Sequence, residues 1–295
     1  MYLDLEDRSI KLNNWAIGMQ RFAVGLAKKV MIADPMGQVA DSVMSLPPTE
    51  INMFWAWIGI FCYALQIFYD FSSYSDMAIG LGRVFNLKFL ENFLFPYSAD
   101  SIQDFWRRWH ISLSSWLRDY VYIPLGGSRV NKFRTNINVW IVFLLCGLWH
   151  GASWNFVIWG AWHGIALTIE RIGFKKVLSS LPYFVRNLWV WLIVLVGWVW
   201  FRAPTLDYAI GYLHTLFIGN NISFWVHLEA YQNISISSII ILLVGFLFCY
   251  QAPNLFFAKN KNSWCIGILG SVILFLLAWT FAVTSTFSPF IYFRF

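Results

Sequence analysis

Two histidines lie in a tryptophan-rich, apolar stretch of the sequence, where an imidazole is unusual. The stretch CGLWHGASWNFVIWGAWHG, residues 146–164, contains His150 and His163 and no acid, lysine or arginine. An imidazole that loses its hydration needs a hydrogen-bond partner, a water-filled cavity or a reaction in which it takes part. The alternative is that each histidine is a packing residue whose hydrogen bonds are satisfied.

The spacing of these two histidines separates their roles. In one continuous helix their side chains would stand ~20 Å apart along the axis and about 140° apart in direction. They therefore cannot share one site unless the chain breaks between them. Gly151 and Ala152 directly follow His150 and indicate a turn, so we assign His150 to chemistry. His163 is predicted to be a helix-packing or hydrogen-bonding residue.

A third histidine lies in DFWRRWHISLSSWLRDYVYIPLGG, residues 104–127. Apolar side chains recur there at intervals of three and four residues, which predicts a helix with an aromatic face that includes His110. Pro124 and the Gly126-Gly127 pair are predicted to end this helix and turn the chain. The alternative is an interfacial helix whose arginines meet lipid phosphates and whose tryptophans sit at headgroup depth. That interpretation leaves His110 without a role.

The composition indicates a membrane protein. Of 295 residues, 59% are hydrophobic and 12% are charged, about half the charged share of an ordinary soluble domain. Lipid headgroups and topology account for the net charge of +6, and no motif suggests nucleic-acid binding. The four cysteines have neither CxxC spacing nor nearby histidines at zinc-ligand spacing, so they are interpreted as packing residues and no metal site is expected.

Apolar runs predict up to six helices in the bilayer. The runs cover residues 53–69, 137–150, 152–169, 188–201, 236–250 and 264–284, and only the last reaches the ~20 residues that span a bilayer unaided. The segment 15–33 resembles a partly buried or interfacial helix. If each run crosses once, the basic loops at 107–134, 171–186 and 259–261 share one side, which the positive-inside rule makes cytoplasmic. Residues 203–233 then lie outside.

The organisation predicted is one integral-membrane domain over residues 1–295, all-α and multi-pass, because no repeat, linker or strand-period alternation is found. The first residues, MYLDLEDRSIKLNN, are acidic and polar and do not resemble a signal peptide. They lead directly into a helix typical of the middle of a protein. We therefore expect earlier membrane spans to be missing from this chain.

Several long motifs resemble the membrane-bound O-acyltransferase family, in particular the branch that contains the alginate O-acetyltransferase membrane subunit. The motifs are FWRRWHISLSSWLRDYVYIPLGGSR, NVWIVFLLCGLWHGASWNFVIWGAWHG, QIFYDFSSYSDMAIGLGRVFNL and VGWVWFRAPTLDYAIGYL. The similarity runs from about Trp15 to the terminal SPFIYFRF. The resemblance implies an all-helical fold around a transmembrane tunnel with re-entrant helices, in a bacterial cytoplasmic membrane.

The resemblance also implies an activity. The family transfers an acyl group from a thioester, commonly acetyl-CoA, to a hydroxyl, and its near-invariant histidine corresponds to His150 in LWHG. A second family histidine corresponds to His110 in WHISLS. In this branch the acetyl group crosses the membrane towards an extracytoplasmic polysaccharide such as alginate, with a separate extracytoplasmic acetyltransferase subunit as partner. No permanently bound cofactor is implied.

The chemistry itself favours a histidine base. Transfer to an alcohol requires removal of the hydroxyl proton, for which a group titrating near neutrality is suited. No GxSxG elbow is present, so direct transfer is favoured over a Ser-His-Asp relay. A dry wall of tryptophans would limit hydrolysis of the thioester; it is predicted from Trp149, Trp154, Trp159 and Trp162. Four residues are predicted to contact the acyl donor: Arg107, Arg108, Trp109 and Trp149. The two arginines would bind its phosphates.

The remaining polar residues are given structural roles. Asp70 and Asp76 resemble acids at a helix end emerging into water rather than a cation site. Asp119 is expected to pair with a charged neighbour such as Arg118, and His214 and His227 are expected to be solvated. Two other classes of protein stay open: a transporter or flippase, which also holds histidines in a membrane cavity, and a non-catalytic scaffold of a polysaccharide-modifying complex.

Overall fold

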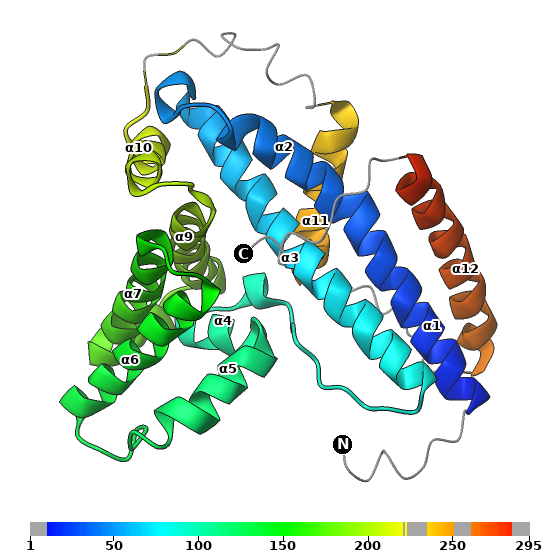
Figure 1. Cartoon of the computed structure of the whole chain (residues 1–295), viewed down its shortest axis with the longest axis horizontal. Coiled ribbons are helices and arrows are strands. Elements are labelled where there is room, and N and C mark those ends of the chain that lie inside the picture. The colour runs from blue at the N-terminus through cyan, green and yellow to red at the C-terminus, as the bar shows by residue number, and fades with distance from the viewer. Residues whose placement is uncertain (1–10, 221, 223–234, 251–260, 285–295) are drawn as a thin grey trace. The chain divides into compact units, whose positions relative to one another are not determined.

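The computed structural model describes residues 11–220, 222, 235–250 and 261–284, and within them the chain forms helices and no strand (Figure 1). The all-α prediction is confirmed for this part of the chain. Contacts divide the protein into two compact units. The first comprises residues 1–39, 65–92 and 232–294, and the second comprises residues 40–64, 93–231 and 295. The prediction of one domain over 1–295 stays a prediction.

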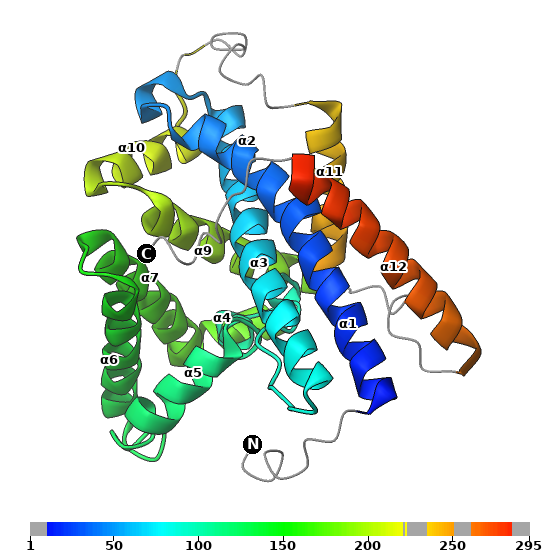
Figure 2. The same cartoon turned by 45° about the vertical axis from the view of Figure 1, so that its right-hand side comes forward.

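The first unit is built from α1 (Leu12–Ala27), the start of α2 (Asp34–Met44), the end of α3 (Met53–Val84), α11 (Ile236–Tyr250) and α12 (Lys261–Thr284). A π-helical turn, Lys28–Ala33, joins α1 to α2. Helices α1 and α12 lie side by side (Figures 1 and 2). Against α3, α1 approaches so closely that a Cβ on Gly18 would collide with the carbonyl oxygen of Gly80. Glycine is required at this crossing.

Buried charges in the first unit are ion-paired. Lys29 Nζ lies 2.6 Å from Asp70 and 2.8 Å from Asp34, and Asp70 is 1% exposed. Asp76 pairs with Arg21 at 2.8 Å and with Lys28 at 2.6 Å. A structural role for both aspartates is confirmed. The expectation that they mark a helix emerging into water is wrong for Asp70. Helix α3 continues beyond Asp70, and the carboxylate contacts Lys29 rather than water.

The second unit contains the predicted chemistry. Its helices are α4 (Ile102–Arg108), α5 (Ile111–Leu117), α6 (Lys132–His150), α7 (Trp154–Ile169), α8 (Lys175–Ser179), α9 (Tyr183–Arg202) and α10 (Leu206–Phe217), together with the end of α2 and the start of α3. Helix α6 packs along α7, and α7 along α9 (Figure 1). A Cβ on Gly160 would collide with the carbonyl oxygen of Phe143, so a glycine is what allows α6 and α7 to touch.

Two of the described helices are long and apolar enough to cross a bilayer: α3, with 32 residues, and α9, with 20. They contain the predicted runs 53–69 and 188–201 and extend them through flanking residues, as expected. The runs at 137–150, 152–169 and 236–250 lie in α6, α7 and α11, which have 19, 16 and 15 residues. The number of crossings stays a prediction.

Candidate functional site

His110 lies at a break in the helix predicted around it. Helix α4 ends at Arg108, α5 begins at Ile111, and His110 between them has φ +45°, in the left-handed region. The prediction of one continuous helix is therefore wrong. The apolar residues keep helical spacing across the break, although the backbone is not helical at His110. The pattern of apolar residues therefore could not have revealed the break. The predicted turn at Gly126 and Gly127 is confirmed by their φ angles of +99° and +55°.

The His110 side chain is held in a largely dry environment. It is 8% exposed, and its Nδ1 lies 3.2 Å from the hydroxyl oxygen of Ser112. Burial, and after it the charge of His150, lowers the pKa of His110 to about 3. The imidazole is therefore neutral at neutral pH and accepts a proton less readily than a solvated histidine, which suits hydrogen bonding or positioning better than general base catalysis.

His150 is the last residue of α6, and α7 begins only at Trp154, so the turn predicted after this histidine is confirmed. Aromatic rings surround the imidazole. Their centroids lie 4.9 Å away for Trp149, 5.0 Å for Trp159 and 4.9 Å for Phe201. Burial among apolar rings disfavours the charged imidazolium, whereas the carbonyl end of a helix favours it.

The fold brings His110 and His150 together, although 40 residues separate them in the sequence. The indole of Trp149 contacts both, at centroid distances of 6.1 Å to His110 and 4.9 Å to His150. Trp149 is 55% exposed, so this part of the site is open on one side. The arrangement places two neutral imidazoles around one exposed indole, which suits removal of a proton from a bound hydroxyl.

His163 and His150 both contact the ring of Trp159, because the chain turns between α6 and α7. The centroid distances to this ring are 5.0 Å for His150 and 5.3 Å for His163. His163 is 1% exposed, as a packing residue would be. Of the predicted tryptophan wall, Trp159 is buried, whereas Trp154 is 71% exposed.

A buried glutamate that the sequence analysis overlooked positions α4. The carboxylate of Glu170, 2% exposed, accepts hydrogen bonds from the backbone nitrogen atoms of Ile102 at 2.7 Å and Gln103 at 3.3 Å, and from the indole of Trp189 at 3.1 Å. The N–H groups at the start of α4 have no partner within the helix, and here they donate to a negatively charged carboxylate. In the sequence, Glu170 is one acid at the end of an apolar run. Such an acid is equally typical of the end of a membrane-spanning helix, so the capping role could not be recognised.

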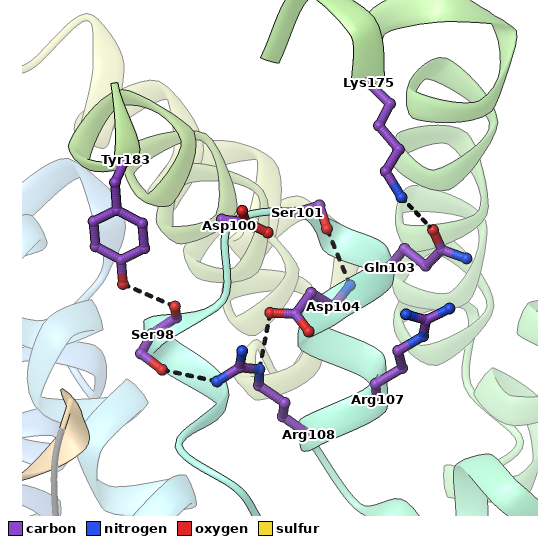
Figure 3. Close-up of a pocket in the computed structure, with 9 residues that line it drawn as sticks. All are labelled: Ser98, Asp100, Ser101, Gln103, Asp104, Arg107, Arg108, Lys175 and Tyr183. Carbon is purple, nitrogen blue, oxygen red and sulfur yellow. Dashed lines mark hydrogen bonds and ion pairs between the residues drawn. The ribbon is translucent and has the colours of Figure 1, made fainter. Parts of the chain in front are cut away.

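A polar pocket of about 330 Å³ lies beside α4 (Figure 3). Three cations and two carboxylates are among its lining residues: Arg107, Arg108, Lys175, Asp100 and Asp104. Each carboxylate is already paired, Asp104 with Arg108 at 2.8 Å and Asp100 with Arg186 at 2.6 Å.

Arg107 is exposed and has no charged partner within the described ranges, and Lys175 donates only to the amide of Gln103, at 2.8 Å. The pocket therefore has free positive charge. Figure 3 shows the Arg107 side chain without a partner among the residues drawn.

The four residues predicted to contact the acyl donor lie in different parts of the second unit. Arg107 and Arg108 line the pocket. Trp109 is 5% exposed and packs 5.6 Å from Phe105 and 5.0 Å from Trp198, and Trp149 lies beside the two histidines. Neither tryptophan is among the pocket's lining residues.

The other sequence predictions have simple outcomes. No group of metal-binding side chains is found in the part of the chain that the structure covers. Cys62, Cys146 and Cys249 are buried and free, as expected of packing residues. Asp119 pairs with Arg118 at 2.7 Å, and His214 is exposed. His227 lies outside the described residues.

The sequence is similar to known proteins of one enzyme family. The sequence model of the membrane-bound O-acyltransferase family matches residues 4–208. The probable alginate O-acetylase of Azotobacter vinelandii is 51% identical over 206 residues, which cover 68% of this chain and 40% of that protein. The peptidoglycan O-acetyltransferase of Helicobacter pylori is 36% identical over 316 residues, covering 100% of this chain and 59% of that protein.

A more distant relative is the teichoic acid D-alanyltransferase of Bacillus subtilis, which is 29% identical over 187 residues, covering 61% of this chain and 47% of that protein. The chain therefore spans about 40 to 59% of the length of these curated relatives. The matched family region includes α4, the break at His110 and the turn after His150.

Proposed function

The chain belongs to the membrane-bound O-acyltransferase family, and we propose that it transfers an acetyl group from acetyl-CoA to the hydroxyl of an extracytoplasmic polysaccharide. The observation that carries this proposal is the meeting of His110 and His150 around Trp149. The names of the relatives support the reaction class, since they include two O-acetyltransferring proteins with different acceptors.

In the proposed mechanism His150 is the general base. Its neutral imidazole accepts the proton of the acceptor hydroxyl as that oxygen attacks the thioester carbonyl. The carbon–sulfur bond then breaks, the acetyl ester is formed, and the proton is passed to the departing thiolate. His110 assists by orienting the reactants or by sharing the proton transfer. The aromatic rings around His150 limit the access of water, which would otherwise hydrolyse the thioester.

The pocket beside α4 is the proposed site for the phosphates of the donor. Arg107 presents a planar guanidinium with several donors, and Lys175 adds a second cation. Arg108 contributes less, because Asp104 and Ser98 already accept from it at 2.8 and 3.2 Å. Only Trp109 lies between Arg108 and His110 in the sequence, so the proposed phosphate site and the second histidine belong to one segment.

The protein is further proposed to be a multi-pass protein of the bacterial cytoplasmic membrane, with an extracytoplasmic acetyltransferase subunit as partner. The basic loops at 107–134 and 171–186 would then face the cytoplasm, where acetyl-CoA is available. Because Arg107 and Lys175 both lie in these loops, the proposed donor pocket and the proposed orientation support each other.

The test is acetyl transfer by the complete protein in proteoliposomes supplied with labelled acetyl-CoA on one side. An acyltransferase is expected to move label from the donor to a polysaccharide or to its partner subunit, and to release free CoA in equal amount. A transporter or flippase would move an unreacted molecule and release no CoA. A scaffold would show neither result unless its partner were present.

A further inference from the structure

His163 is a buried imidazole whose nitrogen atoms are not used by the fold. The residue is 1% exposed, and neither Nδ1 nor Nε2 has a hydrogen-bond partner among the residues that the structure describes. Four aromatic rings form a cage around it, with centroids 5.1 to 6.5 Å away: Phe105, Trp106, Phe143 and Trp159. A phenylalanine would suit such a cage without adding unpaired nitrogen atoms to it.

Two further polar atoms in the cage are in the same condition. The indole nitrogens of Trp106 and Trp159 are buried and, in the described part of the chain, have no hydrogen-bond partner. Unpaired buried polar groups are unfavourable, and native proteins contain few of them. Here three such side chains are in ring contact with one another, since Trp106 and Trp159 are also 5.7 Å apart. Packing explains why aromatic rings are found here, but not why three of them have buried nitrogen atoms.

The cage adjoins the proposed acyl-transfer site. The Trp159 ring contacts both His163 and His150, at interplanar angles of 70° and 87°. The His163 ring is also fixed in place: a Cβ on Gly197 of α9 would lie 2.8 Å from its Nε2. A ring held this closely keeps its unpaired atoms at a constant distance from the proposed base.

We propose that His163, together with Trp106 and Trp159, binds an uncharged oxygen atom during acyl transfer, either the carbonyl oxygen of the acyl group or an ordered water. The two indoles offer one donor each, and a neutral imidazole offers one donor and one acceptor. The two indole N–H groups match an oxygen with two lone pairs, and the imidazole adds an acceptor when that oxygen belongs to a water. The ligand is held by hydrogen bonds, and no covalent bond is made or broken at His163. The inference rests on the proposed function.

The test separates the polar atoms of His163 from its shape. In the complete protein, His163→Phe and His163→Leu remove the nitrogen atoms, and His163→Gln and His163→Asn keep a hydrogen-bonding group. The rate per folded molecule is expected to fall about tenfold or more in the two apolar variants and less in the two polar ones. His214→Phe, the same change at an exposed histidine, is the matched control and is expected to keep the wild-type rate.

The result that overturns the proposal is an equal rate for apolar and polar variants per folded molecule, since that is what a packing role predicts. Rates are compared per folded molecule, so a lower yield of one variant does not obscure the answer. Loss of transfer in every variant of His150, with wild-type transfer in His163→Phe, would retain the proposed function and reject this site alone.

The source of the oxygen is identified by infrared spectra with acetyl-CoA carrying a ¹³C-labelled carbonyl. A carbonyl band at lower frequency in the wild type than in His163→Phe assigns the acyl oxygen to the cage. Identical bands in both proteins, together with the lost rate of the apolar variants, assign an ordered water.

Discussion

In the first unit the buried charged side chains Lys29 and Asp70 are ion-paired, whereas in the second unit the buried imidazoles lie among aromatic rings. Lys29 lies between Asp34 and Asp70, with contacts of 2.8 and 2.6 Å. Burial raises the pKa of Asp34, although Lys29 acts to lower it. His163, by contrast, is as buried as Asp70 and has no hydrogen-bond partner in the described ranges.

The difference distinguishes structural from chemical uses of a polar side chain. A buried ion pair makes its contacts within the fold, so removing one partner damages the fold. A neutral imidazole beside aromatic rings keeps its lone pair for a ligand or a proton. We therefore expect substitutions in the first unit to act mainly on stability, and substitutions of the imidazoles in the second unit to act mainly on the rate of transfer.

The largest loss of stability is expected for Lys29→Met. This change removes the cation between Asp70, which is buried, and Asp34, which is half-buried, and loss of one partner costs about 3–5 kcal/mol in comparable buried pairs. Thermal unfolding in detergent measures the effect. The double variant Lys29→Met with Asp70→Asn is expected to recover part of the stability, because one buried charge is removed. A single variant as stable as the wild type would show that the ion pair is not structural.

The next effect is expected for Glu170→Gln, which weakens the cap of α4. The neutral amide oxygen can still accept from Ile102, but the negative charge that the start of α4 and the Trp189 indole donate to is lost. The expected loss in the free energy of unfolding is about 1–3 kcal/mol. The melting temperature should fall, and the donor concentration at half-maximal rate should rise because α4 carries Arg107. Glu50→Gln, at an exposed glutamate, is the matched control. Equal melting temperatures for both variants would reject the capping role.

A smaller effect, on donor binding alone, is expected for Arg107→Gln. This exposed arginine has no charged partner in the described structure, so its removal should leave the yield of folded protein unchanged. The KM for acetyl-CoA should rise about three- to tenfold, with kcat nearly constant, since a phosphate contact acts in the ground state and the transition state alike. Arg108→Gln breaks the pair with Asp104 and should also lower the yield. Unchanged donor dependence in Arg107→Gln would remove the pocket from the donor site.

The smallest effect is expected for Asp119→Asn. Arg118 lowers the pKa of Asp119, but the carboxylate is fully exposed and screened by water. Any stability from this pair is present above the ordinary pKa of an aspartate and is lost as the pH falls through the lowered one. The melting temperatures of variant and wild type should coincide at pH 7. A clear difference would show that Asp119 has a partner besides Arg118.

The sequence predicted the parts of the fold that depend on local pattern. The helices, the turn after His150 and the Gly126-Gly127 turn follow from apolar spacing and glycine chemistry. The break at His110 could not be predicted, because the aromatic residues keep helical spacing across it. The ion pair of Lys29 with Asp70 and the Glu170 cap join residues 41 and 67 or more positions apart, and no single-sequence pattern records such distances.

The central claim is that His150 acts in acetyl transfer and not in folding. The direct measurement is the rate of label transfer from acetyl-CoA by the complete His150→Ala variant, per folded molecule, beside its melting temperature and with His214→Ala as the control. The account predicts wild-type insertion, a nearly unchanged melting temperature and no transfer for His150→Ala, with normal transfer for His214→Ala. Retention of most of the transfer by His150→Ala would contradict it.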